Sequence, residues 1–175
     1  MRVALTLHPD SRCDAVSAIE VELSRPSAAE MALRYLLKGR IAALRIPQAA
    51  PPARTDELWK HTCFELFARA PSGGYSEFNF SPASQWAAYR FDSYRSGMRP
   101  LDTAPPRISM EATDAQLELD VRLPCPEKAA SLAISAVVET LDGGISYWAV
   151  AHAPGRPDFH HADSFVLTLP APERS

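Results

Sequence analysis

The stretch Leu58–Phe80, LWKHTCFELFARAPSGGYSEFNF, decides the fold because it holds two apolar segments separated by the turn sequence PSGG. Side chains along a β-strand alternate between the two faces of a sheet. On this basis we assign residues 58–68 and 75–80 to two adjacent strands. The Gly-rich turn between them predicts that the strands form a hairpin.

The alternation gives this hairpin one apolar face and one mixed face. The apolar face is expected to be core and carries Leu58, Thr62, Phe64, Leu66, Ala68, Ser76, Phe78 and Phe80. The mixed face carries Trp59, His61, Cys63, Glu65, Phe67, Tyr75, Glu77 and Asn79. A carboxylate and an imidazole between aromatic rings make a poor core, because burying them costs free energy unless each is paired. Aromatic rings beside acids and amides suit a sugar or a similar polar ligand.

Length, charge and cysteine content limit the classes of protein to which the chain can belong. Its 175 residues suffice for one domain with a hydrophobic core. A net charge of −3 without a basic stripe argues against nucleic-acid binding. No apolar run is long enough to span a membrane, and the first residues lack the length of a secretory signal, so we expect a cytoplasmic protein. Cys13, Cys63 and Cys125 form no CxxC pair and are expected to be reduced thiols.

The rest of the chain reads as further short strands joined by Pro- and Gly-rich turns. We expect them at residues 3–7, 18–23, 31–37, 41–46, 86–92, 107–112, 116–123, 132–140, 146–152 and 165–169. Residues 31–37 also suit a turn of helix, but Gly39 and the apolar run 41–46 favour a hairpin. So many short strands predict a single all-β domain over residues 1–175, an antiparallel β-sandwich resembling a jelly roll.

Three stretches resemble DOMON-like relatives of the family 9 carbohydrate-binding modules. They are LWKHTCFELFA at 58–68, YSEFNFSPASQWAAYRF at 75–91 and YWAVAHAPGRPDFHHADSF at 147–165. The resemblance covers about residues 58 to 169. Before residue 58 it extends only to the order of the strands. It implies a β-sandwich that binds saccharide, with two tryptophans clamping a sugar ring and acids, amides and basic groups binding its hydroxyls.

The resemblance also implies roles for individual residues. Trp59 matches the first aromatic plate, and Glu65 matches an acid that binds a hydroxyl. Asn79 matches an amide of the family, whereas Glu77 stands where sugar-binding members tend to have a basic residue. Trp148 is the expected second plate. The loop that follows it offers Phe159, His160 and His161.

The sequence leaves three other functions open. It does not identify a cofactor. A metal or haem site is the first, using histidines and acids or one of two methionines: His61, His152, Asp158, His160, His161, Asp163, Met98 and Met110. A glycan-processing enzyme is the second, because Glu65 and Glu77 face the same way on neighbouring strands. A protein-binding module with exposed aromatic residues is the third.

We therefore predict a non-catalytic protein that binds a small polar ligand, a saccharide, without nucleic-acid or membrane partners. Trp59 and Trp148 are expected to stack on the ligand, while Glu65, Glu77 and Asn79 bind its hydroxyls. The predicted site also includes His61 and Tyr75 on the mixed face, and His152, His160 and His161 at the rim.

Overall fold

The structure, a computed structural model, describes residues 1–126 and 129–173, and this part of the chain is almost entirely β-structure. The strands are β1 (Arg2–Leu7), β2 (Val16–Ser27), β3 (Glu30–Gly39), β4 (Cys63–Arg69), β5 (Tyr75–Phe80), β6 (Trp86–Phe91), β7 (Arg99–Pro100), β8 (Arg107–Ala112), β9 (Gln116–Pro124), β10 (Ser131–Glu139), β11 (Ile145–Ala149) and β12 (Leu167–Thr168). Three short 3-10 turns are η1 (Ile41–Ala43), η2 (Leu58–Lys60) and η3 (Ala162–Ser164). No helix among the described residues has the length and apolar character needed to cross a membrane.

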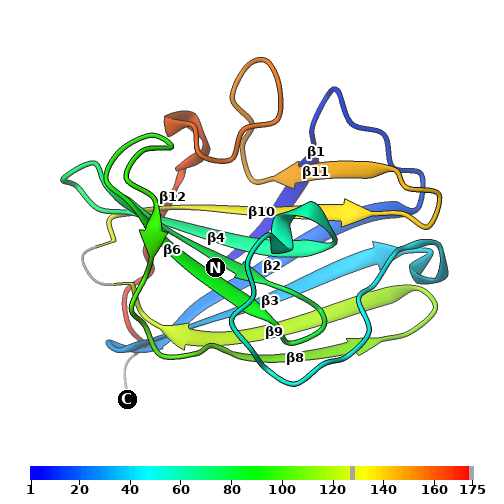
Figure 1. Ribbon diagram of the computed structural model, residues 1–175, viewed down its shortest axis with the longest axis horizontal. Coiled ribbons are helices and arrows are strands. Elements are labelled where there is room, and N and C mark those ends of the chain that lie inside the picture. Colours follow the sequence, from blue (N-terminus) through cyan, green and yellow to red (C-terminus); the bar gives the residue numbers. More distant parts are fainter. Residues whose placement is uncertain (127–128, 174–175) are drawn as a thin grey trace.

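The twelve strands join in one antiparallel sheet with the order β7-β6-β5-β4-β10-β11-β1-β2-β3-β9-β8, and β12 pairs with β10. Strand β1 connects the two halves, since its last residues pair with β11 and its first residues pair with β2. Figure 1 shows the sheet curling, with β8 and β9 at the bottom of the view and β10 and β11 nearer the top. The expected all-β antiparallel class is confirmed. The expected jelly-roll-like sandwich is not confirmed, because β1 hydrogen-bonds to both halves and the strands form one continuous curled sheet.

The main hydrophobic core lies between the two halves of the curled sheet. It takes alternate residues from β2, β3 and β9 on one side and from β4, β5 and β10 on the other. Tyr35 of β3 links the two sides, because its hydroxyl donates to the backbone oxygen of Glu65 at 3.0 Å and its ring lies 4.9 Å from that of Phe64. Phe64, Leu66, Phe78 and Phe80 all belong to this core, as the alternation in the sequence predicts.

The opposite face of β4, β5 and β6 is covered by loops, and we keep the name mixed face for it. A second apolar cluster there includes Phe67, Tyr75, Phe91 and Phe165, with Trp59 packed against it. The covering segments include η2 before β4, the loop between β6 and β7, and the loop between β11 and β12, which rises at the top of Figure 1. Both faces of β4 and β5 are therefore buried, which explains why nearly every residue of these strands is shielded from solvent.

Several predicted strand limits need correction. Residues 58–60 form η2, and β4 begins only at Cys63, because Glu57 adopts a left-handed φ of 63° and starts a 3-10 turn. Residues 41–46 do not pair with β3, whose two edges are already occupied by β2 and β9. The strand expected at 146–152 ends at Ala149.

Candidate ligand-binding site

A cavity of about 530 Å³ opens on the mixed face, between the sheet and its covering loops. Its floor comes from five neighbouring strands and its walls from η2, the β6–β7 loop and the β11–β12 loop. The lining residues are Trp59, Glu65, Phe67, Glu77, Phe91, Arg95, Met98, Val137, Tyr147, Arg156, Pro157, Phe159 and His160. The volume falls in the range of small-molecule sites.

Strand register places the two acids side by side on this floor. Glu65 pairs with Asn79, and Phe67 pairs with Glu77, so the two glutamates are diagonal neighbours on β4 and β5. Both are buried, with 2% and 4% of their surface exposed. Glu65 accepts a hydrogen bond from the Ser135 hydroxyl at 2.8 Å, and Glu77 accepts one from the Asn79 amide at 2.8 Å.

Burial decides the protonation of this carboxyl pair. Removal from water disfavours a charged carboxylate and raises its pKa, and a second carboxylate nearby adds to the effect. Burial, with the charge of Glu77, raises the pKa of Glu65 to about 8. Burial also raises the pKa of Glu77 to about 7, although the Asn79 hydrogen bond and the Arg95 charge oppose that rise. At neutral pH the floor of the cavity therefore retains a proton on the pair.

His160 stands beside the pair as a neutral imidazole. Burial, with the charge of Arg95, lowers the pKa of His160 to about 4. Its Nδ1 lies 2.8 Å from the Tyr75 hydroxyl, and that hydroxyl oxygen already accepts from the backbone N–H of Arg95. The Tyr75 O–H is thus free to donate to Nδ1, which leaves the hydrogen of the neutral ring on Nε2. This Nε2 lies 3.7 Å from an oxygen of Glu77.

The walls of the cavity are largely aromatic and are held by polar contacts between loops. The Trp59 ring meets Tyr89 edge to face at 5.9 Å, and Tyr147 meets Phe159 at 6.0 Å. Arg95 of the β6–β7 loop forms an ion pair with Asp158 of the β11–β12 loop at 2.8 Å. This ion pair ties together the two loops that border the cavity.

The structure brings together only part of the predicted site. Trp59, Glu65, Glu77 and His160 line the cavity. Tyr75 and Asn79 lie behind them and hold His160 and Glu77 by hydrogen bonds. The other four predicted residues lie elsewhere: His61, Trp148, His152 and His161.

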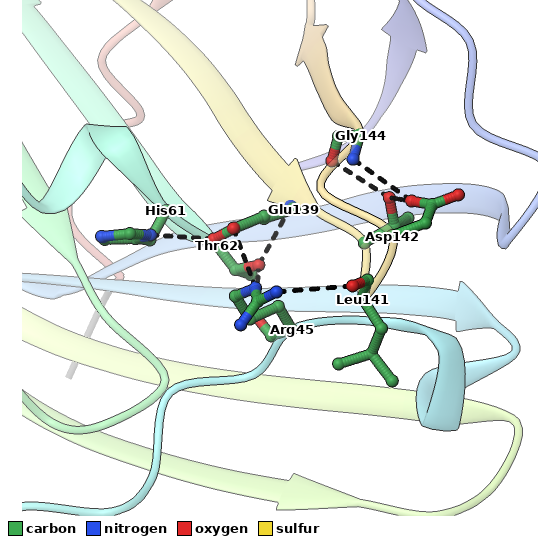
Figure 2. Close-up of polar contacts among 8 residues, drawn as sticks. Arg45, His61, Thr62, Glu139, Leu141, Asp142 and Gly144 are labelled. Atoms are coloured by element: carbon green, nitrogen blue, oxygen red, sulfur yellow. Dashed lines mark hydrogen bonds and ion pairs between the residues drawn. The ribbon is translucent and has the colours of Figure 1, made fainter.

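His61 belongs to a separate polar network at the far end of β10. Its side chain is 63% exposed, and its Nδ1 lies 2.8 Å from Glu139, which also forms an ion pair with Arg45. Figure 2 shows the imidazole directed at Glu139, with Thr62 bridging the backbones of Arg45 and Glu139. His61 misses the cavity because it follows η2 and precedes the first residue of β4, so the strand alternation does not yet apply to it.

Trp148 points into the core between the halves of the sheet, on the opposite side from the cavity. It pairs with Ala136, a core residue, and its indole N–H donates to the Ser146 hydroxyl at 3.0 Å. The adjacent residue Tyr147, which pairs with Val137, faces the cavity in its place. The prediction chose the wrong face of β11.

The remaining two histidines are occupied by local contacts. The Nε2 of His152 lies 2.8 Å from the backbone oxygen of Thr6, and the His152 ring packs against His8 at 4.8 Å. His161 accepts a hydrogen bond from the backbone N–H of Asp163 and so caps the N-terminus of η3. Neither residue lines the cavity: the strand expected to carry His152 ends at Ala149, and the His161 ring lies 6.3 Å from that of Tyr94.

The histidines and acids proposed for a metal site do not assemble. Across residues 1–126 and 129–173, no group of three or more His, Cys, Asp or Glu side chains is placed to hold a metal ion. Met98 lines the cavity, whereas Met110 packs against the main core. The residues present therefore do not fit the metal centre that the sequence left open.

Several lining residues escaped the sequence analysis: Val137, Tyr147, Arg95, Arg156 and Pro157. Val137 and Tyr147 face the cavity through the register of β10 and β11. Strand β10 is buried on both faces, and polar residues such as Ser135 mark the face that Val137 shares, a signal that the apolar run at 132–138 obscures. The loop residues are positioned by tertiary contacts such as the Arg95–Asp158 ion pair, for which the sequence carries no local signal.

A second hollow, of about 680 Å³, lies on the outer face of β1, β2, β3 and β9. Its charged side chains form ion pairs with one another, including Arg34 with Asp120 at 3.0 Å and Arg2 with Glu22 at 3.9 Å. Exposed, mutually paired charges of this kind are typical of a solvated sheet face. The cavity on the mixed face, with its buried acids, is the better candidate site.

These observations define a curled antiparallel β-protein with a polar, aromatic-walled cavity on one face. The fold is similar to that of a candidate carbohydrate-binding protein from Bacteroides uniformis ATCC 8492, known from a crystal structure. The match has a TM-score of 0.64 and 13% sequence identity, and it covers 94% of this chain and 83% of that chain. No protein-family model matches the chain, and neither does any curated protein.

Proposed function

We propose that the protein binds a small polar ligand, a carbohydrate, in the cavity on the mixed face, and that it does so without catalysis. The observation that carries the proposal is the placement of Glu65 and Glu77 on the floor of a cavity with aromatic walls. Sugar rings have apolar faces that stack on aromatic rings and hydroxyls that bind carboxyl groups. In this role Trp59 is the stacking surface and the two glutamates bind hydroxyls.

Similarity of fold supports this proposal. The Bacteroides uniformis protein is described as a candidate carbohydrate-binding protein, and its fold extends over most of this chain. We also propose that the chain is a DOMON-like relative of the family 9 carbohydrate-binding modules. The sequence resemblance over 58–68, 75–91 and 147–165 supports that relationship.

Replacing Trp59 with alanine tests the proposal. Trp59 lines the cavity and is only half-buried, so its loss removes ligand contact more than it removes core packing. We expect Trp59→Ala to weaken saccharide affinity by about tenfold or more, and to change the free energy of unfolding by less than about 1 kcal/mol. Calorimetric titration with a saccharide panel and urea unfolding measure the two quantities.

Trp148→Phe is the matched control, because Trp148 is buried on the opposite side of the sheet. Loss of its hydrogen bond to Ser146 should lower stability by about 1 kcal/mol while leaving affinity unchanged. Equal affinity of the wild-type protein and Trp59→Ala would remove Trp59 from the site. Absence of binding by the wild-type protein to every saccharide would overturn the proposed function.

Catalysis is the second candidate function, and one observation favours it. Two buried carboxyl groups with raised pKa values share a cavity, as acid–base pairs do in enzymes. A carboxyl group that stays protonated near neutral pH can donate to a glycosidic oxygen. Incubation with chromogenic glycosides separates the two functions: turnover that Glu65→Gln abolishes would establish an enzyme.

A further inference from the structure

The carboxyl pair on the cavity floor lacks a balancing cation from the protein. Glu65 has no ion-pair partner among the described residues, and for Glu77 the one titratable nitrogen within 4.0 Å in the described part of the chain is the Nε2 of His160, at 3.7 Å. His160 is neutral, because burial lowers its pKa to about 4. The guanidinium of Arg95 forms its ion pair with Asp158 at 2.8 Å, and Arg156 is exposed at the mouth. Buried acids without a paired cation are costly to ionise.

Each acid also has one oxygen available for a ligand. One oxygen of Glu65 accepts from Ser135, and one oxygen of Glu77 accepts from Asn79. The second oxygen of each carboxyl group has no hydrogen bond to the part of the chain that the structure describes, although both residues line the cavity. A donor with positive charge that enters between the two acids would supply both missing contacts and the missing charge.

We propose that the ligand is an amino sugar, whose ammonium group binds between Glu65 and Glu77 while its ring lies against the aromatic walls. This inference rests on the proposed saccharide site and names its ligand class. An ammonium group has three N–H donors and no acceptor, which suits two carboxylates facing one space. A uronic acid would bring a third carboxyl group, with a further negative charge, to the same floor, so the site disfavours it.

Binding has a defined proton balance. The free pair holds one proton, as one carboxylic acid and one carboxylate. When the ammonium group enters, both acids become carboxylates, no covalent bond to carbon changes, and the displaced proton passes to the buffer.

The other groups facing the pair do not compete for this proton. The charged and titratable neighbours, from every element around the cavity, are Cys63, Tyr75, Tyr89, Arg95, Tyr147, Arg156, Asp158 and His160. Burial raises the pKa values of the Cys63 thiol and of the Tyr75 and Tyr89 hydroxyls, away from neutrality. The pKa of His160 falls to about 4, and hydrogen bonds from Tyr94 and Arg95 lower the pKa of Asp158 against the effect of burial.

Calorimetric titration of the full chain with three matched sets of probes tests the inference. The sets are built on glucosamine, galactosamine and mannosamine, each with its N-acetyl and hydroxyl counterparts. We expect at least one amino sugar to bind about tenfold or more tightly than its N-acetyl and hydroxyl counterparts. Titration near neutral pH in phosphate and in Tris should give different heats, because a proton is released to the buffer.

Control probes and variants separate the alternatives. Glu77→Gln should remove both the amine preference and the proton release while leaving weak binding of the hydroxyl counterpart. Methylamine binding as tightly as the amino sugar would show an amine site and overturn the sugar class. Equal binding of the amino and N-acetyl forms without proton release would overturn the inference and leave the proposed saccharide function standing. No binding by any sugar would overturn both.

Discussion

The free energy of unfolding should fall by roughly 1–3 kcal/mol between about pH 6.5 and pH 8.5, and the carboxyl pair should cause most of the fall. Folding raises the pKa of Glu65 to about 8 and that of Glu77 to about 7, from an ordinary value of 4.5. In this window the folded protein therefore binds protons that the unfolded chain does not. A group that holds its proton more tightly when folded stabilises the fold at low pH and loses that effect as pH rises through its folded pKa.

The window starts at about pH 6.5 because His160 opposes the carboxyl pair below that value. Its pKa falls from 6.5 to about 4 on folding, so the unfolded chain binds the extra proton there. The His160 contribution to stability therefore rises with pH up to about 6.5, while the contribution of the carboxyl pair already falls. The desolvation of His152 acts in the same direction. Above about pH 6.5 the contributions of His160 and His152 to stability no longer change with pH. Only the contribution of the carboxyl pair, which has the opposite sign, still changes.

Urea unfolding across this pH range measures the effect, and amide variants assign it. Glu65→Gln and Glu77→Gln should flatten the slope and raise stability at high pH, because a neutral amide replaces a carboxylate that is costly to bury. Glu118→Gln is the matched control, since Glu118 lies on the outer face of β9 in an exposed ion pair with Arg34. A wild-type stability that rises between pH 6.5 and 8.5, or a slope that both cavity variants leave intact, would contradict this account.

Phe64→Ala should lower the free energy of unfolding by about 3–5 kcal/mol, the largest effect expected of a single substitution here. Phe64 is fully buried in the core between the two halves of the sheet. Its ring lies 4.9 Å from Tyr35 on the facing half, so its removal leaves a void where the halves meet. This void removes packing contacts from both halves of the sheet.

Phe64→Leu provides the comparison, because leucine keeps most of the apolar volume. It should cost less than Phe64→Ala and should keep ligand affinity, since Phe64 and Glu65 face opposite sides of β4. Chemical denaturation of both variants gives the measurement. A loss below about 1 kcal/mol for Phe64→Ala would show that the two halves do not share one core.

The fold was predictable where strands alternate and turns are explicit. The segments around PSGG and around Asp142-Gly143-Gly144 became hairpins, and the register that follows sets Glu65 beside Glu77. That alternation is a property of neighbouring residues, and so it can be read from the sequence. The single continuous sheet could not be predicted, because the pairing of β1 with β11 joins residues that are far apart in the chain.

The site was predictable on β4 and β5 and less so elsewhere. Trp148 was assigned to the ligand face because the family resemblance implies a second aromatic plate on a late strand, whereas the pairing of β11 with β10 turns Tyr147 to the cavity. Strand β10 is buried on both faces, so only small polar residues such as Ser135 distinguish the cavity face from the core face. His61 and Arg95 illustrate the other limit, because contacts with acids far away in the chain, the hydrogen bond of His61 to Glu139 and the ion pair of Arg95 with Asp158, hold their side chains in place.

The most direct test of the central claim, that the cavity on the mixed face is the ligand site, is a nuclear magnetic resonance titration of the three indole N–H signals. Of the three tryptophans, Trp59 lines the cavity, while Trp86 and Trp148 are buried in the core between the halves of the sheet. On addition of the saccharide panel, with glucosamine as first probe, we predict that the Trp59 signal shifts with saturation and that the other two stay in place. A saturating ligand that leaves the Trp59 signal unmoved would contradict the account.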